Sequence, residues 1–207
     1  MKCLIVSSGR IESYSWLKKF DFSEYFIISA DGGMKHLKEL GLTADLWIGD
    51  GDSLKNEEVL AKETLRFPVK KDYTDTDLAV MYALENGYYD ITIIGAFGGR
   101  LDHEFSHFCL LKKILDNGGK GTLLDKKNII TMENKSFKIK SRGMKYVSFF
   151  PFGGDVKNFS VKDLLYEAEG IDLKSGLVQA SSNSFSGEAE GTVTFDSGYV
   201  LVIHSND

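Results

Sequence analysis

The sequence predicts an α/β domain with a mainly parallel sheet over residues 1–126, followed by an all-β sandwich domain over residues 127–207. Three observations support this prediction. Short β-branched runs alternate with segments of helical spacing in the first part. Alternating polar and apolar segments, separated by Gly, Asn, Asp and Ser, fill the second part. The chain has 207 residues, 43% of them hydrophobic, which is enough for two small cores.

The first domain is expected to contain six strands, at residues 3–6, 25–29, 46–48, 65–69, 91–94 and 121–124. Apolar residues at helical spacing lie between them, around residues 16–20, 34–40, 78–83 and 101–115. Gly41, Gly87 and Gly118 stand where three of these helices should end. The strict alternation predicts a Rossmann-like sheet with helices on both faces. The weakest expected element is the segment 56–63, because it is short and mostly polar.

The second domain is expected to be antiparallel. Its predicted strands are residues 136–140, 146–152, 158–161, 191–195 and 199–204. No convincing amphipathic helix separates them, which favours a sandwich. Asp196, Ser197 and Gly198 between the last two runs are typical of a hairpin turn.

Composition limits the possible functions and locations. The formal net charge is 25 − 30 = −5, which argues against a general binder of nucleic-acid backbones. No apolar run reaches transmembrane length and the N-terminal run is too short for a signal peptide, so we expect a cytoplasmic protein with no membrane partner. Cys3 and Cys109 lie in apolar contexts, and both are expected to be buried and unpaired.

Polar residues gather after five of the predicted strands. The segments are SSGR (7–10), ADGG (30–33), GDGDS (49–53), KKDYTDTD (70–77) and GAFGGRLDH (95–103). In parallel α/β sheets, ligands bind beyond the carboxyl ends of the strands, which lie at one edge. This edge is therefore the expected site.

Asp50 and Asp52 lie either side of one glycine at the end of an apolar run. Two ionised carboxylates at this spacing repel each other unless a cation lies between them. In any single loop such acids are usually turn residues, and Asp77 or Asp102 could simply cap a helix. Acids crowded on one edge, after four of the five strands, with Arg100 and glycine-rich backbone beside them, instead favour Mg²⁺ carrying a polyphosphate.

Other nucleotide and metal motifs are missing from the sequence. It contains no GxxxxGK[ST] loop, no GxGxxG after the first strand and no DFG. His103 and His107 are four residues apart but lack the glutamate of HExxH and a third ligand, so we expect a polar residue near a helix start and a partly buried one, respectively. His36 and His204 are expected to be structural or solvated.

The motifs ADGG, IGDGDS (48–53), KDYTDTD (71–77), GAFGGRLDH and SNSFSGE (182–188) together resemble, in order, those of the thiamine pyrophosphokinase family. The resemblance implies transfer of a pyrophosphoryl group from ATP to the hydroxyl of thiamine, giving thiamine diphosphate and AMP. It also implies Mg²⁺ and a homodimer with the thiamine site at the subunit interface. Gly51 departs from the family, which more often has a side chain there.

The resemblance also implies roles for particular residues. The magnesium ligands would be Asp50, Asp52 and Asp75. Arg100 and Asp102 would engage the phosphates and assist the transfer. Ser182, Asn183 and Phe185 would contact thiamine, with Phe185 stacked on one of its rings. Further nucleotide contacts are expected at Asp31, Gly32, Lys71, Asp72, Asp77, Gly99 and His103.

Some alternatives remain open at this stage. The sequence does not choose the proton acceptor among Asp75, Asp77 and Asp102. A different Mg²⁺-dependent phosphoryl transferase acting on a small alcohol would also need the acidic edge. A non-catalytic thiamine- or nucleotide-binding domain is the third alternative, although binding alone rarely needs so many carboxylates.

Overall fold

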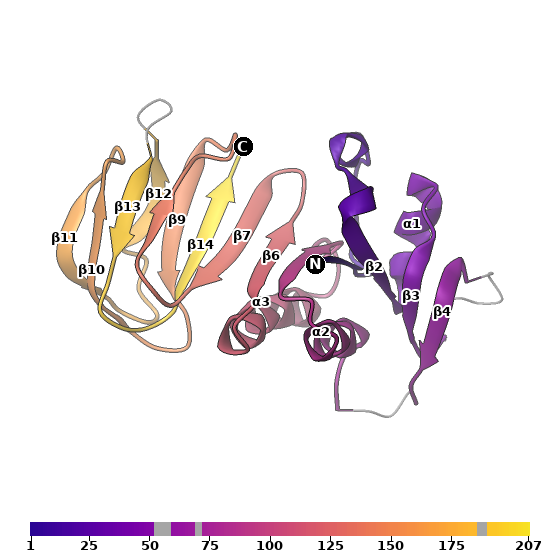
Figure 1. The fold of residues 1–207 in the computed structure, drawn as a ribbon. Helices are drawn as coiled ribbons and strands as arrows, with labels where there is room; N and C mark the ends of the chain where they lie inside the picture. Colours follow the sequence, from indigo (N-terminus) through magenta and orange to yellow (C-terminus); the bar gives the residue numbers. More distant parts are fainter. Residues whose placement is uncertain (52–58, 69–71, 186–189) are drawn as a thin grey trace. The chain divides into compact units, whose positions relative to one another are not determined.

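A computed structural model describes residues 1–51, 59–68, 72–185 and 190–207. The chain divides into two compact units, Met1–Lys126 and Lys127–Asp207. Figure 1 traces both units along the chain.

The sheet of the first unit is parallel throughout. Its strands are β1 (Lys2–Val6), β2 (Tyr25–Ala30), β3 (Ala44–Gly49), β4 (Ala61–Arg66), β5 (Asp90–Ile94) and β6 (Lys120–Leu124). They lie in the order β6-β5-β1-β2-β3-β4, and each neighbouring pair is parallel. The predicted α/β domain with a mainly parallel sheet is confirmed.

Helices lie against both faces of this sheet. They are α1 (Met34–Leu40), α2 (Asp75–Glu85) and α3 (Leu101–Asp116), with short 3₁₀ turns η1 (Leu17–Lys19), η2 (Phe22–Glu24) and η3 (Asp31–Gly33). Leu4 of β1 shares a core with Met34 of α1. On the opposite face, the ring of Phe26 in β2 stacks on Tyr82 of α2 with centroids 6.5 Å apart. Because side chains alternate along a strand, the two helices cover opposite faces.

Two of the predicted helices in the first unit differ in outcome. Gly41 ends α1 in the left-handed conformation, with a φ of 67°, as predicted. The helix expected around residues 16–20 is only the 3₁₀ turn η1.

The edge strand was placed wrongly. Strand β4 covers residues 61–66 rather than 65–69, so it includes the end of the weak segment 56–63, whose residues 56–58 lie outside the described part of the chain. Its side chains from Lys62 to Arg66 are exposed, so no apolar alternation marks it as a strand. Pairing with β3 along one side fixes its conformation instead.

The second unit is an antiparallel sandwich, as predicted. One sheet has the order β12 (Ala180–Ser184), β9 (Tyr146–Pro151), β14 (Val200–Ser205), β7 (Asn128–Glu133). The other has the order β11 (Ala168–Leu173), β10 (Val156–Lys162), β13 (Gly191–Thr194), β8 (Phe137–Ile139). Both sheets contribute to one core, in which the rings of Phe149 and Phe159 lie 5.5 Å apart.

The predicted hairpin at residues 196–198 is wrong. Strands β13 and β14 on either side of it belong to different sheets, so these residues connect the two layers. Gly198 has a φ of 110°, and an added Cβ would lie 2.6 Å from the backbone oxygen of Asp155. Glycine is therefore required at position 198 because the connection between the two sheets has a positive φ and passes close to the Asp155 backbone, and not because of a two-residue hairpin turn.

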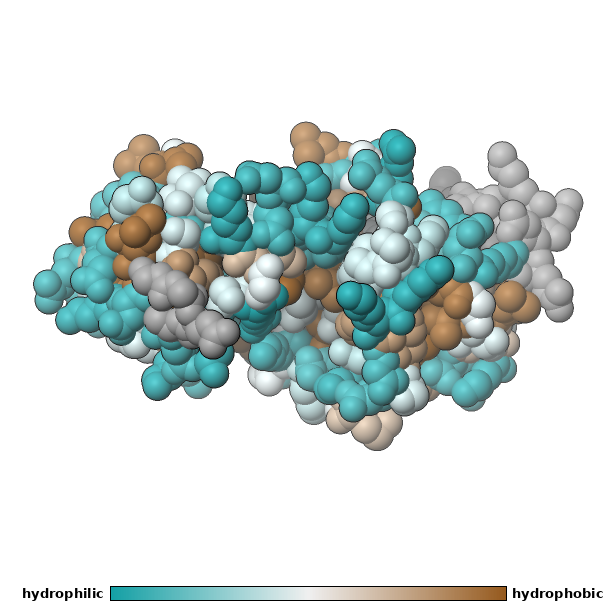
Figure 2. Space-filling view, turned by 90° about the horizontal axis from the view of Figure 1, so that it is seen from above, coloured by the Kyte–Doolittle hydropathy of each residue, from teal (hydrophilic) through white to brown (hydrophobic). Residues whose placement is uncertain are grey.

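The view in Figure 2 is largely hydrophilic, with apolar residues in separate patches. Both cysteines are free, as predicted. Cys3 is buried, and burial raises the pKa of its thiol to about 12. Cys109 is exposed, so its predicted burial is wrong, because it lies on the outer side of α3. None of the helices in the described part of the chain is long and apolar enough to cross a membrane.

Candidate active site

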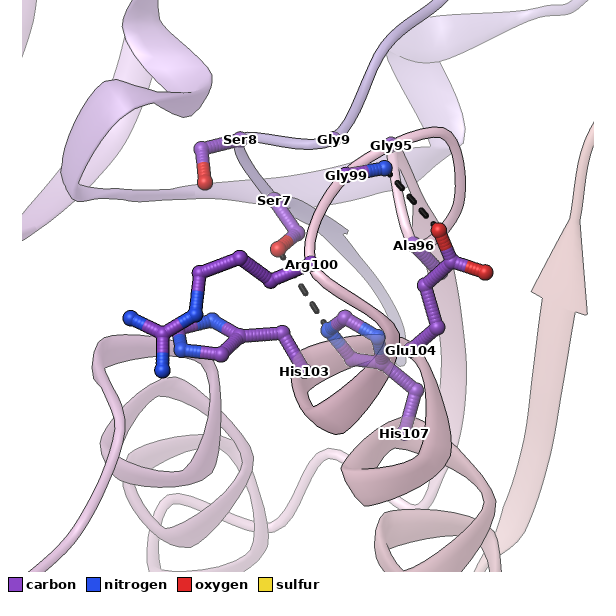
Figure 3. A pocket seen from close by; sticks show the side chains of 10 residues that line it. All are labelled: Ser7, Ser8, Gly9, Gly95, Ala96, Gly99, Arg100, His103, Glu104 and His107. Carbon is purple, nitrogen blue, oxygen red and sulfur yellow. Dashed lines mark hydrogen bonds between the residues drawn. The ribbon is translucent and has the colours of Figure 1, made fainter.

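A pocket lies where the connections of the parallel sheet diverge. From β1 the chain runs outward through β2, β3 and β4, and β5 then returns to the other side of β1. Ligands of open α/β sheets bind at such a point, beyond the carboxyl ends of the strands. A pocket of about 190 Å³ is found there (Figure 3). It is lined by Ser7, Ser8 and Gly9 after β1, by four residues of the loop 95–100 after β5, and by His103, Glu104 and His107 of α3.

Glycines allow the two pocket loops to approach closely. The Gly9 amide donates to the Gly95 carbonyl over 2.8 Å. A Cβ added to Gly9 would lie 2.3 Å from the Phe97 carbonyl oxygen, and one added to Gly95 would lie 2.3 Å from that of Ser7. Any larger residue would force the loops apart. These glycines therefore serve backbone packing first, and this packing shapes the pocket.

Arg100 and Asp102 form a two-bond ion pair at the mouth of the pocket. Arg100 Nε and Nη2 donate to Asp102 Oδ1 and Oδ2 over 3.1 and 2.6 Å. The bond from Arg100 lowers the pKa of Asp102, and the same bond raises the pKa of Arg100. The two side chains are 74% and 62% exposed. Because the pair is solvated, Arg100 can exchange this carboxylate for a phosphate at little cost.

Two further predicted residues, Gly99 and His103, line the same pocket. The Gly99 amide donates to Glu104 Oε1 over 2.9 Å, so this amide already has an anionic partner. Figure 3 shows Arg100 and His103 extending to the side opposite Glu104. An anion would therefore bind on the side of the pocket that carries the Arg100 guanidinium, which we call the cationic side.

The acidic edge continues at the ends of β2 and β3. Asp31 follows β2 and is only 8% exposed, and its Oδ1 has no hydrogen-bond partner among the described residues. A Cβ on Gly49, the residue before Asp50, would lie 2.9 Å from that oxygen. Gly32 continues the same turn. A buried carboxylate oxygen without a donor is costly, and it suits a hard cation.

The loop after β3 carries the first predicted magnesium ligands. Asp50 directly follows the strand, whereas Asp52 lies outside the described residues. Gly51 has a φ of 86°, a left-handed conformation that favours glycine at this position. The guanidinium of Arg66 lies over the ring of Trp47, 5.8 Å from its centroid, and brings a cation close to Gly51.

No group of three or more His, Cys, Asp or Glu that could hold a metal occurs among the residues described here. This leaves the predicted set of Asp50, Asp52 and Asp75 untested, because Asp52 is not described. The carboxylates at the described positions are the oxygen donors that Mg²⁺ requires.

The first turn of α2 holds Asp75 and Asp77. Thr74 is its N-cap, and its hydroxyl accepts from the Asp77 amide over 3.1 Å. Neither Asp77 nor Asp102 occupies an N-cap position, since Arg100 precedes α3. The carboxylate of Asp77 instead pairs with Lys113 of α3 at 2.6 Å. Asp72 is exposed before the helix, and Lys71 lies outside the described residues.

The predicted thiamine contacts lie on or beside β12 of the second unit. Ser182 is exposed and has a φ of 57°. Asn183 is buried, and its side chain both accepts from the Tyr166 amide (2.9 Å) and donates to the Tyr166 carbonyl (2.6 Å). Phe185 is half-buried and lies parallel to the ring of His204, with centroids 6.1 Å apart. Asn183 thus holds the neighbouring loop in place, and Phe185 belongs in part to the core.

Comparison with known proteins decides the family. Residues 17–121 match the family described as "Thiamin pyrophosphokinase, catalytic domain". Residues 135–200 match "Thiamin pyrophosphokinase, vitamin B1 binding domain". The chain belongs to the thiamin pyrophosphokinase family. This confirms the resemblance seen in the sequence motifs.

Relatives of known name agree with this assignment. The chain is 31% identical over 187 residues to the thiamine pyrophosphokinase of Bacillus subtilis, covering 87% of each protein. The crystal structure of thiamine pyrophosphokinase from Bacillus subtilis matches with a TM-score of 0.90 at 27% identity, covering 100% of both chains. The structure of the family protein from Enterococcus faecalis matches with a TM-score of 0.85 at 28% identity, again over 100% of both chains.

Sequence reasoning missed several residues that line this pocket. Ser7 was noted only as part of a strand end, and Glu104 was not considered. His107 was expected to be partly buried, but it is only 5% exposed and still lines the pocket. The strand order would have pointed to these residues, because β1 and β5 are neighbours far apart in sequence. That order is not visible in the alternation of strands and helices.

Proposed function

We propose that this protein transfers the pyrophosphoryl group of ATP to the hydroxyl of thiamine, giving thiamine diphosphate and AMP. The observation that carries the proposal is the pocket at the β1–β5 divergence, with Arg100 at its mouth, within the segment that matches the family's catalytic domain. The thiamine pyrophosphokinase of Bacillus subtilis, aligned over 87% of both chains, supports the same activity.

The triphosphate of ATP binds on the cationic side of the pocket in this proposal. Arg100 turns from Asp102 to the phosphates and offers two parallel donors, which match two phosphate oxygens. His103 lines the pocket on the side of Arg100, and Gly99 also lines the pocket. Asp31, Gly32, Lys71, Asp72 and Asp77 remain predicted contacts of the nucleotide and its metal.

Mg²⁺ is proposed to be held by Asp50, Asp52 and Asp75. The Asp31 Oδ1 atom, which has no hydrogen-bond partner among the described residues, would be a further oxygen donor at the same edge of the sheet. When bound, Mg²⁺ would neutralise negative charge on the triphosphate. Among the described residues, Asp31 follows β2, Asp50 follows β3 and Asp75 begins α2, so each of these carboxylates is carried by the end of a regular element.

The alcohol proton of thiamine must go to a base near the reacting phosphorus. We assign Asp102 the task of orienting Arg100 before ATP arrives. Once Arg100 has turned to the phosphates, Asp102 is free to accept a proton, so Asp75, Asp77 and Asp102 are all candidates for the proton acceptor.

Thiamine is proposed to bind at Ser182 and Phe185, with the Phe185 ring stacked on a thiamine ring. Asn183 acts mainly through its hydrogen bonds to Tyr166. We further propose a homodimer in which the thiamine site needs both subunits. Phe185→Ala should then weaken thiamine binding by about fivefold or more and leave ATP binding unchanged. Equal losses for both substrates would indicate a core role for Phe185.

Product analysis tests the proposed reaction. The protein is incubated with ATP, Mg²⁺ and thiamine, and the products are separated by chromatography. Equimolar AMP and thiamine diphosphate are expected, and EDTA should abolish both. ADP with thiamine monophosphate would instead mean attack at the γ-phosphorus. Binding of both substrates without products would indicate a non-catalytic domain.

A further inference from the structure

Beneath the pocket lies a buried polar network that the sequence motifs do not explain. Ser7 Oγ lies 2.9 Å from Thr76 Oγ1 and 3.4 Å from His107 Nε2. The three residues are 5%, 6% and 5% exposed, and they come from the end of β1, the first turn of α2 and the second turn of α3. Figure 3 shows the Ser7 hydroxyl directed at His107.

Buried hydroxyl groups must be hydrogen-bonded, so this network restricts how its three elements can move. The backbone of Ser7 is also fixed to the sheet, because its amide donates to the Ile94 carbonyl at the end of β5 over 2.9 Å. Breaking the Ser7–Thr76 bond would therefore loosen the first turn of α2 relative to β1, while β1 would remain in the sheet.

The position of Thr76 gives this bond its importance. Thr76 lies between Asp75 and Asp77 in the first turn of α2. The Thr74 hydroxyl caps the start of this turn by accepting from the Asp77 amide, and the ion pair of Asp77 with Lys113 links the turn to α3. Thr76 adds a link to β1, whose next residues, Ser8 and Gly9, line the pocket.

We propose that Ser7, Thr76 and His107 form a positioning network that fixes the Asp75 carboxylate relative to the phosphate-binding pocket. This inference rests on the proposed function, because it assigns Asp75 to the metal and Arg100 to the phosphates. The three residues act through others and do not touch the reacting atoms. His107 supports Ser7 from α3, one turn beyond His103 of the pocket wall.

Thr76→Val tests the network, since it removes one hydroxyl and preserves the side-chain shape. We expect the Mg²⁺ concentration for half-maximal rate to rise about tenfold and kcat to fall by a similar factor, because small misplacements of catalytic groups are costly. The thiamine KM should stay within twofold. Thr76→Ser, which keeps the hydroxyl, should restore near wild-type behaviour.

Thr92→Val is the matched control. Thr92 is 7% exposed within β5, so the same change is made at a threonine of similar burial in the same unit that does not line the pocket. A second readout needs neither metal nor substrate: amide hydrogen exchange in the first turn of α2 should speed up in Thr76→Val and not in Thr92→Val. If Thr76→Val matches Thr92→Val in Mg²⁺ dependence, kcat and exchange, the network has no positioning role.

The proposed function can fail separately. If the wild-type protein makes no thiamine diphosphate, the proposed reaction is wrong, and the network is then tested by calorimetric binding of ATP in the presence of Mg²⁺. Thr76→Val should weaken that binding about tenfold relative to Thr92→Val, since it misplaces the same metal-binding carboxylate. Equal binding by the two variants would overturn the inference.

Discussion

Replacing Arg100 with glutamine tests the phosphate-binding role most sharply among single substitutions. Arg100→Gln removes the charge and the two parallel donors now bound to Asp102 at 3.1 and 2.6 Å. Loss of one preorganised donor to transition-state charge typically costs about 10²- to 10³-fold in rate. We therefore expect kcat/KM for ATP to fall by about that factor. Arg100→Lys keeps the charge but not the two-pronged geometry, and it should lie between wild type and glutamine.

Stability should hardly change in these variants. The Arg100 and Asp102 side chains are 74% and 62% exposed, and exposed ion pairs contribute little to folding. The melting temperature should stay within about 2 °C of wild type, since surface substitutions away from buried groups have small effects. A large loss of activity with an unchanged melting temperature would separate binding from folding.

Lys112→Gln provides the control for Arg100→Gln. It removes a cation from an exposed ion pair with Asp116 on the same helix, but near its other end. Initial rates at varied ATP, with thermal melts of each variant, complete the assay. Arg100→Gln with kcat/KM within threefold of Lys112→Gln would refute the assignment of Arg100 to the phosphates.

Three further predictions follow from buried groups. Asp31 has a φ of 40°, which asparagine also tolerates, so the melting temperature of Asp31→Asn should match or exceed that of wild type. Its Mg²⁺-dependent activity should fall about tenfold or more, because an amide oxygen is a poorer ligand than a carboxylate. Unchanged kinetics would exclude a role at the metal. Asn183→Ala removes the hydrogen-bond partner of the Tyr166 amide and carbonyl, so the free energy of unfolding should fall by about 2 kcal/mol, or roughly 5 °C in melting temperature. A shift of less than about 1 °C by calorimetry would contradict this. Burial lowers the pKa of His36 from 6.5 to about 4, so the neutral ring stabilises the fold fully above pH 6.5 and this stability is lost as the pH falls toward 4. The melting temperature of wild type should therefore drop faster than that of His36→Gln over this range, and parallel curves would disprove it.

The general architecture could be predicted because it depends on local patterns. Strand–helix alternation before residue 126 and strand alternation after it are periodicities that single segments reveal. Strand β4 was misplaced because its exposed edge position leaves no such pattern. The residues 196–198 look like a hairpin locally, yet tertiary packing sends the next strand into the other sheet.

The candidate site was predictable only where residues carry unusual chemistry. Arg100 and the aspartates at strand ends attract notice by their charge and position. Ser7 and His107 do not, because their role depends on β1 lying beside β5 and on burial beneath the pocket. Asn183 was expected to contact a ligand, whereas its hydrogen bonds to Tyr166 can be seen only in the folded chain.

Transfer of a labelled phosphate tests the central claim most directly. ATP carrying ³²P at the β-phosphate is incubated with the protein, thiamine and Mg²⁺, and the labelled product is identified by chromatography. Pyrophosphoryl transfer predicts that all transferred label appears in thiamine diphosphate and that the AMP formed is unlabelled. Label retained in ADP, with unlabelled thiamine monophosphate as the other product, would contradict the account.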